Sequence, residues 1–130
     1  MSGTGQKRKT ILIVEDSATQ ALHLQSVLEE IGLQVIWSED GRAGLKMAHQ
    51  AQPDLIVLDV QLPDMDGFQV CQSLKSQSDT LHIPVIMLTR HDNPQEVMQG
   101  LQTGVVDYIP KDAFAEAVLI ETLKQMGFVN

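Results

Sequence analysis

The sequence has little cysteine and no long hydrophobic run. Cys71 is the only cysteine among 130 residues, so no internal disulfide can form and nothing requires an oxidising compartment. No apolar segment approaches the roughly 20 residues of a membrane-spanning helix. The polar segment 1–9 precedes an apolar run that is too short for the core of a signal peptide. These absences predict a cytoplasmic protein.

Positive charge and aromatic residues are also scarce. Nine Lys and Arg stand against 17 Asp and Glu, which gives a formal net charge of −8. Such a chain repels nucleic-acid phosphates, and its one basic cluster, residues 7–9, lies in the N-terminal segment. Trp37 and Tyr108 are too few to form a base-stacking surface. We therefore expect neither nucleic acid nor a membrane as a partner.

The composition itself is that of one globular domain. Hydrophobic residues make up 43% of the chain and charged residues 20%, and 130 residues are enough to bury a core. We expect a flexible tail over residues 1–9 and a single domain over residues 10–127.

Short apolar runs alternate five times with segments of helical periodicity. The runs predict strands at 10–15, 33–38, 55–59, 85–89 and 105–109, each buried on both faces. Ser17 and Gln20 match a capping box at the start of the first helix, which ends before Gly32. Asp40 is expected to cap the second helix and Pro94 to begin the fourth. The predicted helices cover residues 18–31, 41–48, 67–74, 94–101 and 113–126.

Strict alternation of strands and helices predicts the fold class. It indicates an α/β, doubly wound, five-stranded parallel sheet with helices on both faces. The flavodoxin-like strand order 2-1-3-4-5 places the first and third strands side by side, and ligands bind at the carboxyl ends of strands in such sheets.

Reactive side chains follow four of the predicted strands. Glu15 and Asp16 end the first, Asp59 ends the third, Thr89 ends the fourth and Lys111 follows the fifth. Taken singly, each has an ordinary explanation: a helix cap, β propensity or a solvated charge. At one edge they form a set, and three crowded carboxylates require a cation, for which Mg²⁺ is suited. The set predicts phosphoryl transfer with a carboxylate as nucleophile.

Five sequence segments resemble the receiver domains of bacterial response regulators, the CheY-like family of two-component signalling. The resemblance runs from Thr10 to about Gly127 and indicates a stand-alone receiver. The segments are ILIVEDS (11–17), PDLIVLD (53–59), LPDMDG (62–67), PVIMLT (84–89) and GVVDYIPK (104–111).

The resemblance implies a phosphorylation site and a metal site. Asp59 would accept a phosphoryl group from a histidine kinase or a phosphotransfer protein. Asp16, Asp59 and the main-chain carbonyl of Gln61 would hold Mg²⁺, and Glu15 would act through water. The chain would then be no enzyme in the ordinary sense, since it would catalyse only its own phosphoryl transfer and dephosphorylation.

The resemblance also implies how the signal leaves the site. Lys111 would pair with the acyl phosphate, and Thr89 would swing toward it. Tyr108 would change rotamer on the face formed by the fourth helix, the fifth strand and the fifth helix, where an unknown downstream protein would bind.

Some positions depart from the family pattern. Arg90 stands where a small residue is usual, Lys111 is followed by Asp112 where proline is usual, and Glu15 replaces the commoner Asp. Arg90 is therefore a candidate for tuning the lifetime of the phosphoryl group. Gln61 and His91, which stand two residues after Asp59 and Thr89, are two further candidates.

Two other functions fit parts of the pattern. The first is a receiver-like docking module that works without phosphorylation, although retention of the acidic, Thr and Lys set disfavours it. The second is a phosphatase of the haloacid-dehalogenase type, which also uses an aspartyl nucleophile. That family has a second acid two residues after the first, where this chain has Gln61.

Overall fold

A computed structural model describes residues 8–90 and 93–130, so most of the predicted tail and His91 lie outside the described residues. The described residues form one parallel sheet of five strands in the order β2-β1-β3-β4-β5, which confirms the predicted fold class. The elements are β1 (Thr10–Val14), α1 (Ala18–Glu30), β2 (Gln34–Ser38), α2 (Gly41–Ala51), β3 (Leu55–Leu58), α3 (Gly67–Lys75), β4 (Val85–Thr89), α4 (Pro94–Gln102), β5 (Asp107–Pro110) and α5 (Ala115–Gln125).

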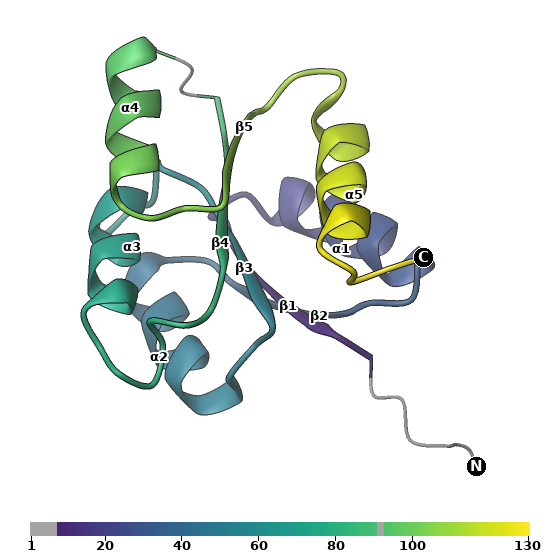
Figure 1. Cartoon of the computed structure of the whole chain (residues 1–130), viewed down its shortest axis with the longest axis horizontal. Coiled ribbons are helices and arrows are strands. Elements are labelled where there is room, and N and C mark those ends of the chain that lie inside the picture. The colour runs from purple at the N-terminus through teal and green to yellow at the C-terminus, as the bar shows by residue number, and fades with distance from the viewer. Residues whose placement is uncertain (1–7, 91–92) are drawn as a thin grey trace.

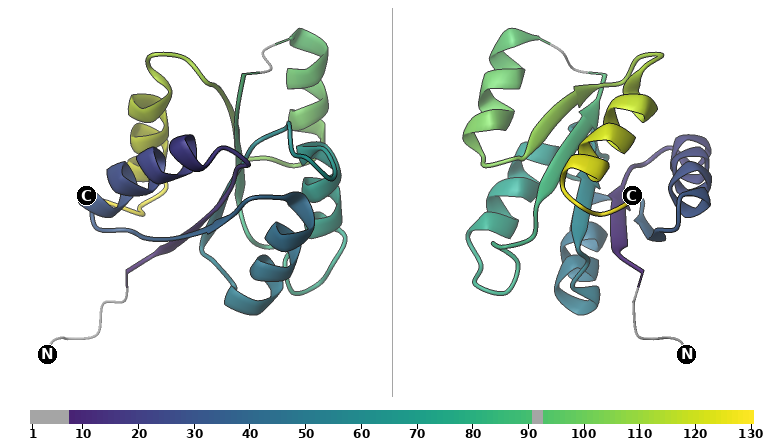
Figure 2. Two further views of the ribbon diagram at one scale, coloured as in Figure 1. Left: turned by 180° about the vertical axis from the view of Figure 1, so that it is seen from behind. Right: turned by 45° about the vertical axis from the view of Figure 1, so that its right-hand side comes forward.

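The sheet lies between two layers of helices. Helices α1 and α5 cover one face, and α2, α3 and α4 cover the other (Figure 1 and Figure 2). Successive strand residues alternate between these faces. In β1, Ile11 and Ile13 join the cluster beneath α1 and α5, whereas Leu12 and Val14 join the cluster beneath the other three helices. Burial on both faces explains why the strands are continuous apolar runs rather than alternating ones.

The predicted helix ends are mostly confirmed. Gly32 follows the C-cap residue of α1 and has φ +97°, a left-handed conformation that favours glycine. The Asp40 side chain accepts the Ala43 N–H at 2.8 Å and so caps α2. Pro94 is the first residue of α4. Among the described residues no helix is long and apolar enough to cross a bilayer.

The capping box predicted at the start of α1 is only half formed. The Ser17 hydroxyl accepts the Gln20 N–H at 3.3 Å, but the Gln20 side chain does not return to Ser17. Its Oε1 instead accepts a hydrogen bond from Lys111. The chain completes a capping box at α3, between Asp66 and Gln69.

The last strand and helix begin later than predicted. Strand β5 begins at Asp107 rather than Val105, and α5 begins at Ala115 rather than residue 113. The Asp112 side chain accepts the Phe114 N–H at 2.8 Å, which forms a turn before the helix rather than its N-cap. Lys111 and Asp112 therefore sit in a loop between β5 and α5.

Candidate functional site

Three carboxylates meet at the carboxyl ends of β1 and β3. Glu15 and Asp16 directly follow β1, and Asp59 directly follows β3, its neighbour in the sheet. One carboxylate oxygen from each residue lies within 4.8 Å of the other two. Glu15 and Asp59 are 6% and 9% exposed, whereas Asp16 is exposed. The sheet topology therefore gathers the predicted acidic residues into one site with a single exposed member.

The Lys111 ammonium lies among these acids. Its Nζ donates to Asp59 Oδ2 at 2.9 Å and to Gln20 Oε1 at 2.6 Å, and it forms a short ion pair with Glu15 Oε1. The side chain is 16% exposed. A lysine ammonium has three N–H donors, so these three contacts use all of them. Lys111 thus compensates two buried carboxylates and is itself fixed in direction.

Glu15 is held from several sides. Its Oε2 accepts the Ser17 N–H at 3.1 Å, and its main-chain carbonyl accepts the Trp37 indole N–H at 2.7 Å. Burial raises the pKa of Glu15, and this outweighs the opposing effect of Lys111 and the Ser17 N–H. The Trp37 contact joins β2 to Glu15, and it places the only tryptophan in the sequence beside the acidic cluster.

The loop after Asp59 wraps back onto its own backbone. The Gln61 N–H donates to Asp59 Oδ1 at 3.2 Å, and Gln61 forms an isolated β-bridge with Asp66. The Gly67 N–H donates to the Val60 carbonyl at 2.7 Å. A Cβ on Gly67 would lie 2.4 Å from the Asp59 carbonyl oxygen, so only glycine permits this approach. The loop fixes both the Asp59 carboxylate and the main chain of Gln61.

Asp64 ties the same loop to the start of α2. Its two carboxylate oxygens accept the Gly41 N–H at 2.8 Å and the Arg42 N–H at 3.0 Å. Desolvation acts to raise the pKa of Asp64, but the backbone hydrogen bonds from Arg42 and Gly41, together with the Arg42 charge and the Asp64 N–H, outweigh it and lower the pKa. Asp40 occupies the N-cap position, so α2 is capped by two acids from separate parts of the chain. Sequence spacing does not signal a contact between residues so far apart.

The site opens into a polar cavity of about 310 Å³. All the described residues of the predicted site except Tyr108 line this cavity: Glu15, Asp16, Asp59, Gln61, Thr89, Arg90 and Lys111. Ser17 and Gln20 line it as well. Thr89 is fully buried at its wall, while Arg90 is exposed. His91, the third tuning candidate, lies outside the described residues.

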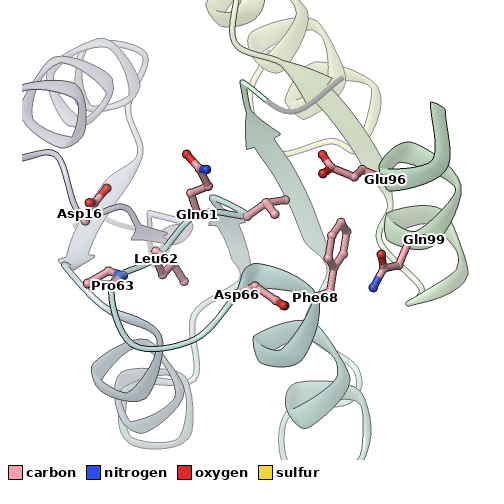
Figure 3. A pocket seen from close by; sticks show the side chains of 9 residues that line it. Asp16, Gln61, Leu62, Pro63, Asp66, Phe68, Glu96 and Gln99 are labelled. Carbon is pink, nitrogen blue, oxygen red and sulfur yellow. The ribbon is translucent and has the colours of Figure 1, made fainter. Parts of the chain in front are cut away.

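A larger cavity of about 540 Å³ adjoins the site on the side of α4. Figure 3 shows Asp16 and Gln61 at one end of it and Glu96 and Gln99, both on α4, at the other, with the Phe68 ring between them. Asp16 and Gln61 line both cavities, so the two lie next to each other.

Tyr108 lies apart from the acidic residues. It is 8% exposed and pairs in register with Met87 of β4. A Cβ on Gly100 would lie 2.7 Å from the tyrosine ring, so the ring packs directly beneath a glycine of α4. In this conformation Tyr108 points into the core.

The donor set suits a hard divalent cation. Carboxylate oxygens from Glu15, Asp16 and Asp59 converge, and Gln61, whose main-chain carbonyl is the other predicted ligand, lines the same cavity. Mg²⁺ prefers oxygen ligands of this kind and is often bound through one or two carboxylates. The three carboxylates and Lys111 together leave two negative charges, which one Mg²⁺ would balance. The residues present therefore fit this ion.

Comparison with known proteins places the chain among signalling proteins. The model of the response regulator receiver domain family matches residues 11–124. The alkaline phosphatase synthesis transcriptional regulatory protein PhoP of Bacillus subtilis is 44% identical over 103 residues, which cover 79% of this chain and 42% of PhoP. Protein PilH of Pseudomonas aeruginosa is 37% identical over 109 residues, which cover 84% of this chain and 90% of PilH.

A solved structure with a bound metal is also similar. The Mn²⁺-bound form of the response regulator Rcp1 has a TM-score of 0.75 and 29% sequence identity, over 92% of this chain and 94% of that chain. This chain spans less than half the length of several curated relatives that it matches, PhoP among them.

Proposed function

The chain belongs to the family of response regulator receiver domains, and we propose that Asp59 is its phosphorylation site. One observation carries the proposal: the Asp59 carboxylate lines a polar cavity and accepts a hydrogen bond from Lys111 Nζ at 2.9 Å. A nucleophile for phosphoryl transfer needs a positive group that can meet the incoming phosphoryl oxygens, and Lys111 is that group.

The proposed donor is a phosphohistidine of a histidine kinase or a phosphotransfer protein. A carboxylate oxygen of Asp59 would form a bond to phosphorus while the phosphorus–nitrogen bond of the donor breaks. The bonding electrons would pass to the imidazole nitrogen, which takes up a proton from solvent. The product is an acyl phosphate, and water attack on its phosphorus would later restore the Asp59 carboxylate and release phosphate.

Mg²⁺ is the proposed cofactor, held by Asp16, Asp59 and the Gln61 main-chain carbonyl, with Glu15 acting through water. When bound, the ion would neutralise charge on the phosphoryl oxygens. The convergence of the three carboxylates and the Mn²⁺-bound Rcp1 structure support the proposal. Lys111 and the Thr89 hydroxyl would contact the remaining phosphoryl oxygens.

The proposed output surface is the face formed by α4, β5 and α5. Tyr108, whose ring packs beneath Gly100, would change rotamer when Thr89 moves toward the phosphoryl group. An unidentified downstream protein would then bind this face. Exposed apolar side chains on or beside these elements supply contact area for such a partner: Met98, Leu101, Val106, Phe114 and Val118.

Residues at the mouth of the cavity are the proposed determinants of phosphoryl lifetime. Gln61 is exposed and lines both cavities, and Arg90 brings a second cation beside Lys111. His91 was the third candidate on sequence grounds. A cytoplasmic location, as expected from the sequence, is part of the same proposal.

Incubation with acetyl phosphate and Mg²⁺, followed by intact mass measurement, tests the function. The wild-type chain should gain the mass of one phosphoryl group, and Asp59→Asn should gain none. Chelation of Mg²⁺ with EDTA should prevent the gain in the wild type. A gain in both proteins would move the site away from Asp59. No gain in the wild type would favour the docking module that works without phosphorylation.

A further inference from the structure

The Gln20 side chain accepts a hydrogen bond from a distant residue, Lys111, rather than from its own helix start. It is the third residue of α1, where a capping box would turn its side chain back to the Ser17 N–H. That N–H is taken by Glu15 Oε2 at 3.1 Å. The Gln20 amide instead reaches Lys111, 91 positions later in the chain, where Oε1 lies 2.6 Å from Nζ. A local helix contact is replaced by a contact in the phosphorylation site.

The Gln20 carbonyl differs in charge from the other two acceptors of Lys111. Glu15 and Asp59 are carboxylates, whereas Gln20 is a neutral amide. When Asp59 carries a phosphoryl group, Lys111 must direct an N–H to a phosphoryl oxygen. A neutral acceptor orients the ammonium for this exchange and leaves its positive charge available.

A third cavity offers the Lys111 side chain another direction. This cavity, of about 250 Å³, lies between the starts of α1 and α5, and both Gln20 and Lys111 line it. Asp112 and Glu116 also line it. Asp112 Oδ1 accepts the Phe114 N–H and Glu116 Oε2 pairs with His23, and the second oxygen of each carboxylate is an alternative acceptor for an ammonium. Lysine has a flexible four-carbon stem, and nothing in the residue itself fixes its direction. Gln20 lines both this cavity and the cavity of the phosphorylation site, and its Oε1 accepts from the same Nζ that donates to Asp59.

We propose that Gln20 is a positioning residue that orients Lys111 toward the phosphoryl group on Asp59. The inference rests on the proposed function, because it assigns Lys111 to the phosphoryl oxygens. In this proposal Gln20 is not a ligand of the metal and acts through Lys111. Its contribution should therefore appear in the affinity for a phosphoryl group and be absent from the affinity for Mg²⁺.

Gln20→Met tests this, because methionine keeps the length and the helix propensity of glutamine and removes the acceptor. Calorimetry should measure Mg²⁺ binding alone and then beryllofluoride, a phosphoryl mimic, at saturating Mg²⁺. We expect Gln20→Met to bind beryllofluoride about tenfold more weakly, as for the loss of one hydrogen bond to a charged group. Its Mg²⁺ affinity should equal that of the wild type. Gln25→Met is the matched control on α1, since Gln25 contacts only the exposed Glu29 in the described hydrogen-bond network, and it should change neither affinity.

A double-mutant cycle separates positioning from a general structural effect. In a Lys111→Ala background, Gln20→Met should have no further effect on beryllofluoride affinity, because the group that it orients is absent. An equal loss in both backgrounds, an equal loss of Mg²⁺ affinity, or unchanged beryllofluoride affinity would overturn the inference alone. A wild-type chain that binds no beryllofluoride would overturn the proposed function, and this inference with it.

Discussion

Asp16→Asn should make the protein more stable without Mg²⁺ and less stable with it. Asp16 is the exposed member of the acidic cluster, and its carboxylate oxygen lies within 4.8 Å of those of Glu15 and Asp59. At that separation, two like charges repel by about 0.9 kcal/mol in bulk water and about 3.5 kcal/mol at an effective dielectric constant of 20. Since Asp16 faces solvent, the water value is appropriate, and because the Lys111 ammonium offsets one of the two neighbouring negative charges, about 0.9 kcal/mol of repulsion remains.

Mg²⁺ should reverse this order. An ion that binds only the folded protein stabilises it by about 2.7 kcal/mol at 100 times its dissociation constant. The wild type should gain this amount. Asp16→Asn should gain much less, because it lacks one of the proposed ligands. The variant should therefore be the more stable protein in EDTA by about 1 kcal/mol and the less stable one at saturating Mg²⁺.

Urea denaturation, followed by Trp37 fluorescence and by circular dichroism, measures both free energies of unfolding. Ionic strength must be matched with NaCl, because added salt alone screens the repulsion. Glu29→Gln on the surface of α1 is a control for the loss of one acidic charge and should keep the full response to Mg²⁺. A variant that is no more stable than the wild type in EDTA would refute the repulsion argument. An undiminished response to Mg²⁺ would refute the assignment of Asp16 as a ligand.

Three further substitutions test the residues that hold the loops and side chains around the site in place. Asp64→Ala should cost about 1 kcal/mol in urea denaturation, as for the loss of a helix cap. Because the folded-state pKa of Asp64 is lowered, this difference should persist above its ordinary value of 3.8 and shrink as the pH falls through the folded pKa. Gly67→Ala should cost about 2–3 kcal/mol and weaken Mg²⁺ binding, because the new Cβ meets the Asp59 carbonyl at 2.4 Å. Gly100→Ala should expel the Tyr108 ring, and ¹⁹F NMR of this single tyrosine, labelled with fluorotyrosine, should show a solvent-exposed resonance; an unshifted resonance would contradict the packing.

The architecture was predictable from the sequence because the strands are buried on both faces. Burial of this kind leaves continuous apolar runs that contrast with the helical periodicity between them, so the order of elements follows. Chain direction then brings the ends of β1 and β3 together without any side-chain information. Element ends were less predictable at β5 and α5. There the Asp112 turn, a hydrogen bond between a side chain and a nearby N–H, competes with helix formation.

The supports of the site were not predictable in the same way. Gln20 fits a local rule for helix caps, yet its side chain serves Lys111 because Glu15 has already satisfied the Ser17 N–H. Asp64 belongs to a recognisable segment, but its contact with the start of α2 depends on how two loops meet in space. Local rules describe what a side chain satisfies near itself in sequence, and they do not describe competition from distant partners.

The geometry also connects the proposed phosphorylation site to the proposed output face by a short path. The main-chain N–H of Lys111 donates to the main-chain carbonyl of Thr89 at 2.7 Å, so the ends of β4 and β5 are joined beside Asp59. Tyr108 lies three residues earlier on β5, and its ring packs beneath Gly100 of α4. All three N–H groups of the Lys111 ammonium already donate to Glu15, Gln20 and Asp59. A phosphoryl group can therefore engage this ammonium only by displacing an existing contact. The free energy of that exchange is what would bias the Tyr108 ring between two rotamers, since a ligand shifts such an equilibrium only through contacts that differ between the two states.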